Sequence, residues 1–336
     1  MPPTLSRERL VSLLEAASSK RIAVVGDAML DVYLRGEVER ISPEAPVPVV
    51  RVLDRRYALG GAANVAQNVR AVGAECDLVA AIGDDMGGRQ LRSMLEAIGA
   101  SGDSLIGVNR PTTTKTRIVA RSQQVVRVDE EDDSDHAGPD TERVLAAVQA
   151  AIARADALVL EDYNKGMLMP RIIEAAMQSA KARNIPIVVD PKYKNFFTFR
   201  GATIFKPNRR ELETALGADV DLEHPAALPT TFSRLGVEHL LLTLGENGMV
   251  LISSGGAVKR VPTAARAVYD VVGAGDTVTA YLALMLAAGG SATEAAVIAN
   301  FAAGVEVEKA GAATVSPNEV VEAYDHYRNN STNTEI

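Results

Sequence analysis

Two glycines and an alanine run directly into a carboxylate near the end of the sequence. The stretch DVVGAGDTVTAYLAL, residues 270–284, places Gly273, Ala274 and Gly275 before Asp276 and then continues with helical apolar spacing. Exposed backbone N–H groups and the positive end of a helix dipole can hold an anion, or a charge that develops in a transition state. A carboxylate there would repel phosphate unless it accepts a proton as a phosphoryl group arrives. The pattern predicts general-base catalysis by Asp276, with a simple charge–dipole contact as the structural alternative.

A glycine pair in the first third of the chain is a second candidate binding element. Gly60 and Gly61 let a ligand approach the backbone closely, and Asn64 lies near the start of the helical segment that follows. Asp31 comes just after the first predicted strand, where its carboxylate can accept hydrogen bonds from hydroxyl groups. Loop glycines with a helix cap, and a solvated aspartate, are the structural alternatives.

Two further patterns lie in the second half of the chain. Asn208 and Glu211 form an N-x-x-E pattern that opens a helix, which is typical of a capping box and also of a phosphate-binding helix start. Thr243 ends a predicted strand, and Gly245 and Gly248 form the turn after it. That turn is either a plain hairpin or a glycine bend whose backbone lies against a nucleotide.

The elements that must position these residues alternate along the chain. Short β-branched runs are predicted as buried strands at residues 21–30, 76–83, 155–163, 185–191, 202–208 and 239–245. Helical patterns lie between them at residues 61–74, 87–100, 141–155 and 170–184. This alternation predicts an α/β fold with a doubly wound, mostly parallel sheet and helices on both faces. Ligands of such sheets bind beyond the carboxyl ends of the strands.

Two segments interrupt the alternation and predict a small separate sheet. Residues 32–59 hold three prolines and a strand-like VPVVRV, and residues 111–129 hold two β-rich pieces around RSQQ. A few strands alone bury too little surface, so they must cover a ligand or pair with another copy. We expect one domain over residues 1–330 with an inserted β-lid that also forms a homodimer, and a disordered tail over 331–336.

The composition narrows the class of protein. The chain has 336 residues, a formal charge of −8 and only 4% aromatic residues with no Trp, which argues against a nucleic acid or an anionic membrane as the main partner. A single cysteine, Cys76, excludes an internal disulfide, and the four histidines form no metal-ligand pair. The sequence carries no signal peptide pattern, no apolar run long enough to span a bilayer and no GxGxxG turn of a dehydrogenase. We expect a cytoplasmic protein that handles a metabolite.

In this order, the four patterns resemble the ribokinase (PfkB) family of carbohydrate kinases. The segment GGAANVAQNVRAVGAECDLVAAIGDD is similar to the first signature of that family and DVVGAGDTVTAYL to the second, and the resemblance runs from about residue 20 to 328. It implies a ribokinase-like fold, ATP as co-substrate and Mg²⁺. It also implies roles for individual residues in the base, the anion hole, the sugar site and the nucleotide site.

In the reacting centre, the resemblance implies that Asp276 is the base and that Gly273, Ala274 and Gly275 join it in the anion hole. The residues implied to hold sugar hydroxyls are Asp31, Gly60, Gly61 and Asn64. Those implied to position Mg²⁺ through water are Asn208 and Glu211. Those implied to line the nucleotide are Thr243, Gly245 and Gly248, with Asn300 near the adenine. Asp270 and the Val272 backbone match a monovalent-cation site of the family. The family usually has Asp-Thr-Thr or Asp-Pro-Thr before the glycine turn, whereas this chain has Asp270-Val271-Val272, which leaves K⁺ dependence open.

Two stretches are similar to the heptose 7-phosphate kinases of the family, namely GEVERISPEAPVPVVRV and LEDYNKGML. They imply phosphorylation of the C1 hydroxyl of D-glycero-β-D-manno-heptose 7-phosphate to the 1,7-bisphosphate, within ADP-heptose and lipopolysaccharide synthesis. No HxGH nucleotidyltransferase motif is present, so we expect the kinase-only form. Other sugars, sugar phosphates or nucleosides remain alternative acceptors, and a non-catalytic binding protein is the alternative of another class.

A phosphorylated substrate needs cationic partners. The candidates follow predicted strands or lie in the lid, and they are Lys165, Lys192, Lys194, Arg117 and Arg121. Each is alternatively a solvated surface charge. Lys165 and Lys192 are favoured because each comes directly after a predicted strand of the main sheet.

Overall fold

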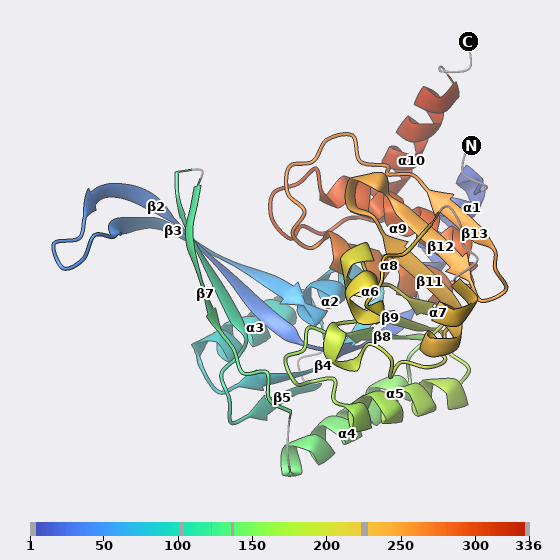
Figure 1. The fold of residues 1–336 in the computed structure, drawn as a ribbon, viewed down its shortest axis with the longest axis horizontal. Helices are drawn as coiled ribbons and strands as arrows, with labels where there is room; N and C mark the ends of the chain where they lie inside the picture. The colour runs from blue at the N-terminus through green and yellow to red at the C-terminus, as the bar shows by residue number, and fades with distance from the viewer. Residues whose placement is uncertain (1–4, 101–103, 122, 136–137, 223–227, 333–336) are drawn as a thin grey trace.

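The computed structural model describes residues 5–100, 104–121, 123–135, 138–222 and 228–332. Nine strands of this part of the chain form one sheet (Figure 1), in the order β13-β12-β11-β10-β9-β8-β1-β4-β5. Their bounds are β1 (Arg21–Gly26), β4 (Glu75–Gly83), β5 (Leu105–Val108), β8 (Ala157–Glu161), β9 (Ile187–Asp190), β10 (Ile204–Phe205), β11 (His239–Thr243), β12 (Met249–Ser253) and β13 (Val258–Val261).

The main sheet is mostly parallel. The strands from β5 through β1 to β11 pair in parallel, and β12 and β13 complete one edge in antiparallel pairing. Central strands such as β8 and β9 are buried along their whole length, which is why they read as continuous apolar runs. The predicted doubly wound sheet is therefore confirmed.

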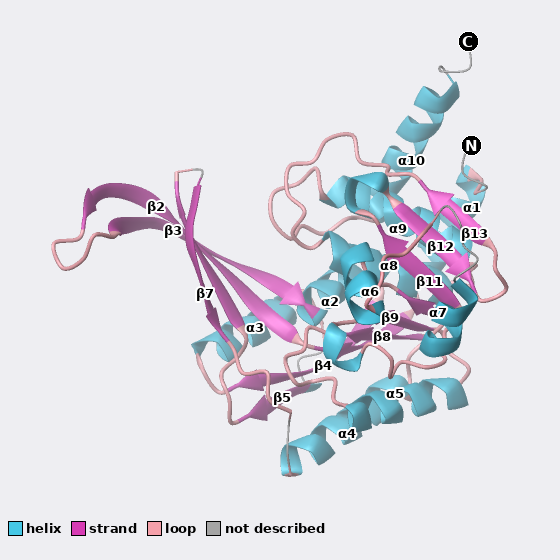
Figure 2. Ribbon diagram, in the orientation of Figure 1, coloured by secondary structure: helices cyan, strands magenta, loops and turns pink. Residues whose placement is uncertain are grey.

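Helices cover both faces of this sheet (Figure 2). Alternate residues of β1 show the two layers, because Ile22 and Val24 belong to one hydrophobic core and Ala23 and Val25 to the other. The helices that contribute to the first core are α1 (Arg7–Ala17), α2 (Ala62–Ala71), α3 (Met86–Ala97), α8 (Ala274–Ala287), α9 (Ala292–Glu306) and α10 (Pro317–Thr332). Those of the second are α4 (Pro139–Ile152), α5 (Pro170–Ala182), α6 (Arg209–Leu216) and α7 (Leu228–Leu235).

A second sheet projects from the body of the molecule (Figure 1). Its order is β3-β2-β6-β7, with β2 (Ala28–Ile41), β3 (Pro48–Gly61), β6 (Thr114–Ala120) and β7 (Gln123–Glu130). The β2–β6 pair is parallel, and the β2–β3 and β6–β7 pairs are antiparallel. These strands contain the two segments expected to form a lid, and we refer to this four-stranded sheet as the outer sheet.

The ends of the chain complete the description. Helix α10 runs through Thr332, into the stretch expected to be a disordered tail, and residues 333–336 lie outside the described part. Among the described residues, we find no helix with both the length and the apolar character needed to cross a membrane.

Candidate active site

Asp276 lies in the first turn of α8, which follows a glycine in the left-handed region. Gly273 is the N-cap with a φ of 98°, and a Cβ there would lie 2.9 Å from Asn64 Nδ2. Only glycine adopts this backbone without strain. The Ala274 amide points to the Val271 carbonyl at 3.4 Å, so the helix start presents chiefly the N–H groups of Gly275 and Asp276.

Two donors hold the Asp276 carboxylate. Asn64 Nδ2 donates to Oδ2 at 2.8 Å, and Tyr163 Oη donates to Oδ1 at 2.8 Å. Asn68, one turn further along α2, donates to the Asn64 carbonyl at 3.0 Å and supports it. Burial raises the pKa of Asp276 to about 6, while the hydrogen bonds from Asn64 and Tyr163 act in the opposite direction. The carboxylate is therefore oriented and poised near neutral pH.

Two more carboxyl groups lie beside Asp276. Oxygen atoms of Glu161, Asp190 and Asp276 lie within 4.8 Å of one another, and Lys206 Nζ is 2.6 Å from Asp190 Oδ2. Burial, and then the charges of Asp190 and Asp276, raise the pKa of Glu161 well above its usual range. A Cβ on Gly275 would lie 3.7 Å from Lys206 Nζ, so the helix start faces this cluster.

The residues predicted to hold sugar hydroxyls lie around the same point. Asp31 is buried on β2, and a Cβ on Gly60 would lie 2.8 Å from Asp31 Oδ2. A Cβ on Gly61 would lie 2.4 Å from the Asp27 carbonyl oxygen and 3.4 Å from Tyr163 Cδ2. The glycine pair thus keeps the backbone close to Asp31 and Tyr163. Asp31 forms an ion pair with Arg117 of β6.

A loop that follows β8 carries Tyr163 into the site. The Asp27 carboxylate accepts from the Tyr163 and Lys165 amides on Oδ2, at 2.8 and 3.0 Å, and from the Met167 amide on Oδ1, at 3.0 Å. Asn164 takes a φ of 54° in the same loop. One buried carboxylate after β1 therefore determines the course of the whole loop.

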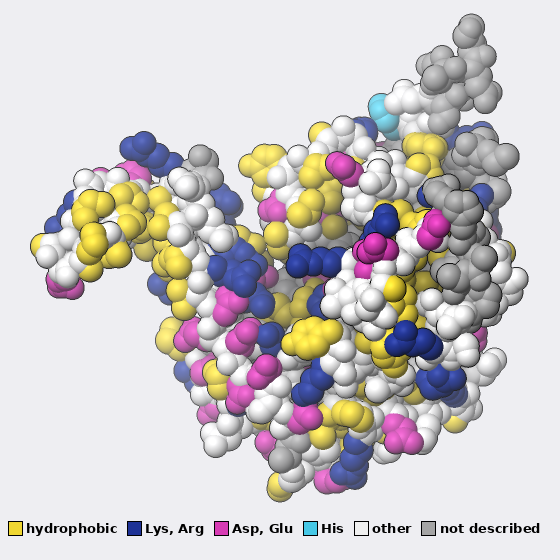
Figure 3. Space-filling view, in the orientation of Figure 1, with side chains coloured by type: hydrophobic (Ala, Val, Ile, Leu, Met, Phe, Trp, Pro, Cys, Tyr) yellow, Lys and Arg dark blue, Asp and Glu magenta, His cyan; other side chains and the backbone are white. Residues whose placement is uncertain are grey.

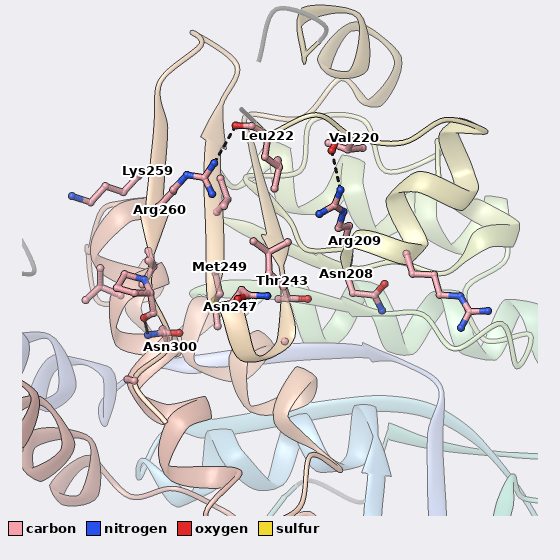
Figure 4. A pocket seen from close by; sticks show the side chains of 18 of the residues that line it. Asn208, Arg209, Val220, Leu222, Thr243, Asn247, Met249, Lys259, Arg260 and Asn300 are labelled. Atoms are coloured by element: carbon pink, nitrogen blue, oxygen red, sulfur yellow. Dashed lines mark hydrogen bonds between the residues drawn. The ribbon is translucent and has the colours of Figure 1, made fainter. Parts of the chain in front are cut away.

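A cavity of about 1250 Å³ opens among β11, β12, β13, α6 and α9 (Figure 4). Apolar side chains such as Met249, Val261 and Val297 line it, together with the predicted nucleotide residues Thr243, Gly245 and Asn300 and the predicted Mg²⁺ residue Asn208. Asn300 donates to the Pro262 carbonyl at 2.8 Å. This volume is large enough for a nucleotide.

Gly248 and Glu211 are placed differently from the residues that line this cavity. A Cβ on Gly248 would lie 2.2 Å from the Val261 carbonyl oxygen, so this glycine closes the turn against β13. Glu211 forms the predicted capping box with Asn208, with 2.8 Å hydrogen bonds in both directions. It also forms an ion pair with Lys192.

The predicted phosphate-binding cations are not gathered at one place. Lys192 pairs with Glu211 and lies 5.1 Å from the centre of the Tyr163 ring. Lys165 pairs with Glu131 at 2.8 Å, and Lys194 pairs with Asp135 at 2.7 Å. Arg121 follows β6 at the outer end of the outer sheet, roughly 13 Å along the strand from Arg117, so it does not join the site.

The predicted monovalent-cation residues join two loops. Asp270 accepts from the Val272 amide at 3.1 Å and from the Gly311 amide at 3.0 Å. Burial raises the pKa of the nearby Glu306 to about 8, and the charge of Asp270 contributes. Each Asp270 carboxylate oxygen thus accepts from a backbone amide, and the monovalent-cation site stays a prediction.

Sequence reasoning missed Glu161, Tyr163, Asp190 and Lys206. Each stands at, or just after, the carboxyl end of a strand of the main sheet. A polar residue that ends a buried strand was the signal that was available.

Comparison with known proteins gives three findings. The model of the pfkB family carbohydrate kinases matches residues 19–319. The chain is 43% identical over 319 residues to the bifunctional protein HldE of Rhodospirillum rubrum, and this covers 94% of the chain and 64% of that protein. It is 42% identical over 325 residues to the HldE protein of Citrifermentans bemidjiense, covering 96% and 67%. The chain thus spans about two thirds of the length of these relatives.

Solved structures share the fold. The ribokinase of Arabidopsis thaliana, complexed with ribose and ATP, has a TM-score of 0.73 and 22% identity, covering 91% of this chain and 99% of that one. Phosphofructokinase-2 from Escherichia coli, in complex with potassium, has a TM-score of 0.73 and 16% identity, covering 92% and 99%. The predicted ribokinase-like fold is confirmed.

Proposed function

This chain belongs to the pfkB family of carbohydrate kinases, and on that premise we propose that it phosphorylates D-glycero-β-D-manno-heptose 7-phosphate on its anomeric C1 hydroxyl. The product would be the 1,7-bisphosphate, which enters ADP-heptose and lipopolysaccharide synthesis. ATP-dependent sugar phosphorylation follows from the family. The choice of heptose rests on the stretches GEVERISPEAPVPVVRV and LEDYNKGML, and on the 43% identity to an HldE protein.

The observation that carries the proposal is the environment of Asp276. It is a buried carboxylate at a helix N-terminus that accepts a hydrogen bond from the sugar-side residue Asn64, and burial raises its pKa to about 6. In our proposal the sugar C1 hydroxyl gives its proton to Asp276 as its oxygen attacks the γ-phosphorus and the bond to the ADP oxygen breaks. A base with a pKa near the working pH contributes roughly 10²–10⁴-fold.

The start of α8 and its neighbours would stabilise the negative charge on the phosphoryl group as it is transferred. The Gly275 and Asp276 amides lie at the N-terminus of α8, where the helix dipole favours negative charge, and Lys206 lies beside Gly275. Asp31, Gly60, Gly61 and Asn64 would bind and orient the sugar. Such positioning supplies much of the acceleration in phosphoryl transfer.

ATP would occupy the 1250 Å³ cavity, with its adenine near Asn300 and its phosphates directed to the α8 N-terminus. Asn208 and Glu211 would hold Mg²⁺ through water, and the carboxyl cluster at Asp190 offers further oxygen donors. Bound Mg²⁺ neutralises phosphate charge. Asp270 and the Val272 backbone would hold K⁺.

We also propose that residues 1–330 act as one kinase domain with the outer sheet as its lid, and that the lid forms a homodimer. Val126 and Val128 lie on the same face of β7, and both are exposed. Ile41 and Leu53 of β2 and β3 are exposed as well. An apolar surface on a thin sheet favours burial against a second copy. Because ATP is a cytoplasmic co-substrate, we place the reaction in the cytoplasm.

A kinase assay with both heptose 7-phosphate anomers tests the substrate, with the product position read by phosphorus NMR. We expect a new C1 phosphate resonance for the β anomer. A panel of ribose, fructose phosphates and nucleosides runs beside it. Faster turnover of any of these would replace heptose 7-phosphate as the substrate, and no ADP release with any sugar would favour a binding protein.

A further inference from the structure

We propose that Lys115 and Lys165 form the subsite for the phosphate monoester of the sugar substrate, and that Glu131 occupies this subsite when the substrate is absent. The inference rests on the proposed function, since it needs an acceptor that already carries a phosphate. It assigns that phosphate to residues on two separate elements, the outer sheet and the loop after β8. Its consequence is that substrate binding and lid position depend on one another.

Lys115 lies on the face of the outer sheet that carries Asp31. The two residues are directly opposite each other in the parallel β2–β6 pair, and Tyr33 is opposite Arg117 one step further. Paired residues of neighbouring strands project to the same face, and residues two apart along a strand share it. Asp31, Lys115 and Arg117 therefore form one polar face. Leu30, Val32 and Ile118 alternate with them on the other.

Lys165 reaches the same region from the body of the protein. It follows Tyr163 by two residues, so the two Cα atoms lie within roughly 7 Å. Tyr163 Oη contacts Asp276, and the amides of Tyr163 and Lys165 share the Asp27 carboxylate. Arg110 supports the loop with a 2.7 Å hydrogen bond to the Lys165 carbonyl. The lysine is thus held close to the sugar side of the reacting centre.

One carboxylate joins the two lysines. Glu131 Oε1 lies 2.8 Å from Lys165 Nζ, and Glu131 Oε2 lies 3.7 Å from Lys115 Nζ. Each lysine side chain is only 17% exposed, whereas that of Glu131 is 30% exposed. A carboxylate with one charge bridges two ammonium groups, which leaves one positive charge in excess. A phosphate monoester carries close to two negative charges at neutral pH and matches both lysines.

Glu131 can leave at low cost when a phosphate arrives. Glu131 is the more exposed partner, so water can solvate its carboxylate when it turns away, while the phosphate takes over both ammonium groups. Phosphate oxygens form shorter and stronger charge-assisted hydrogen bonds with the same ammonium groups. Lys and Arg side chains lie where the outer sheet meets the body, with Asp and Glu side chains beside them (Figure 3).

The other cations near the site have different partners. Lys192 pairs with Glu211, which belongs to the N-x-x-E pattern on the nucleotide side. Arg117 pairs with the buried Asp31, and Lys206 with Asp190. Each of these pairs contains a residue that we place in sugar binding, at the Mg²⁺ site or in the carboxyl cluster. Glu131 has no such role, which leaves its two lysines to the phosphate.

Steady-state kinetics of Lys115→Met, Lys165→Met and the double variant test the subsite. We expect the KM for heptose 7-phosphate to rise roughly 10- to 100-fold in each single variant, with the KM for ATP unchanged. The KM for unphosphorylated heptose should stay the same, so the preference for the phosphorylated sugar collapses. Lys181→Met is the matched control, because Lys181 donates to the Arg200 carbonyl from the last turn of α5, which leads into the start of β9 and so lies at the opposite end of the strands from the site.

Glu131→Gln supplies a measurement in the opposite direction. Removal of the competing carboxylate should lower the KM for heptose 7-phosphate or leave it unchanged, and it should not affect unphosphorylated heptose. A rise in that KM comparable to the rise in the lysine variants would overturn the stand-in role of Glu131. Circular dichroism and thermal unfolding of each variant separate loss of fold from loss of binding.

The outcomes distinguish this subsite from the proposed substrate. If the wild type prefers another sugar phosphate, heptose is wrong, and the variants are tested on that sugar phosphate. If the wild type uses phosphorylated and unphosphorylated sugars with equal kcat/KM, the subsite is wrong. An unchanged KM in Lys115→Met and Lys165→Met, together with a raised sugar KM in Lys192→Met, would overturn it in favour of Lys192.

Discussion

The Tyr163 hydroxyl lies 2.8 Å from Asp276 Oδ1 and donates a hydrogen bond to it. The Tyr163 ring in turn lies under the ammonium group of Lys192, which pairs with Glu211 on the nucleotide side. A continuous set of contacts therefore joins the N-x-x-E pattern to the predicted base. Two of its members, Tyr163 and Lys192, come from loops that follow neighbouring strands, β8 and β9.

Replacement of the predicted base removes proton transfer without removing the binding sites. We expect Asp276→Asn to lower kcat by at least roughly 10²–10⁴-fold, because the amide cannot accept the proton of the sugar hydroxyl. Binding of ATP, measured by calorimetry, should stay within a few-fold of the wild type, since the nucleotide cavity is lined by other elements. Turnover close to that of the wild type would refute the assignment of the base.

Tyr163→Phe should change the pH dependence of the reaction. Asp276 acts only when ionised, so kcat/KM falls as the pH drops through its pKa, which burial raises to about 6. The Tyr163 hydroxyl stabilises the ionised form, and its loss should move the acid limb to higher pH by about one pH unit. The pH profile of kcat/KM measures this directly.

The other groups that face Asp276 stay in place in that variant. They are Asn64, Asp190, Lys206, Glu161 and Glu306. Asn64→Ala removes the second donor and should shift the limb in the same direction. A profile of Tyr163→Phe that overlays that of the wild type would show that the tyrosine fills space only.

The capping box at α6 separates structure from catalysis. Asn208→Ala removes the N-cap acceptor of the Glu211 amide, so we expect the free energy of unfolding to fall by about 1 kcal/mol. If Asn208 also positions Mg²⁺, the Mg²⁺ concentration needed for half-maximal rate should rise. The matched control is Ser291→Ala in the capping box of α9, which should cost similar stability and leave the kinetics unchanged. Equal Mg²⁺ dependence in both variants would show that Asn208 only caps α6 and does not position Mg²⁺.

The outer sheet offers a test of the proposed homodimer. Replacing Val126 and Val128 together by Glu places charges on the exposed apolar face of β7, where they would oppose burial against a second copy. We expect light scattering after size exclusion to show a dimer for the wild type and a monomer for the variant. A wild type that elutes as a monomer at micromolar concentration would exclude this dimer.

Much of the fold could be predicted from local patterns. The strand expected at residues 76–83 is found at Glu75–Gly83, and the one expected at 239–245 at His239–Thr243. Buried strands of a parallel sheet need apolar side chains on both faces, so the chain records them as continuous runs. The predicted capping box of Asn208 and Glu211 is also present. It too is a local feature, because its partners are three residues apart.

The composition of the site depended on more than local patterns. Tyr163 and Asn64 are 113 and 212 residues from Asp276 in sequence, yet both bond its carboxylate. Parallel strands gather their carboxyl ends at one edge, so the sequence indicated which ends would meet. It did not indicate which side chains would turn inward. Burial of Asp27 and its hydrogen bonds to the loop after β8 decide that for Tyr163.

By itself, the sequence determined three things. These are the order along the chain of the segments that carry the chemistry, the glycine turn before Asp276 and the family. Backbone conformation and the start of a helix are local properties. The turn before α8 needs a residue with a φ of 98°, and only glycine adopts that value without strain, whatever the surrounding fold. Only the tertiary structure decided the partners of each charge, namely Glu211 for Lys192, Glu131 for Lys165 and Asp190 for Lys206. Ion pairs form between side chains brought together by packing, and no spacing along the chain encodes that distance.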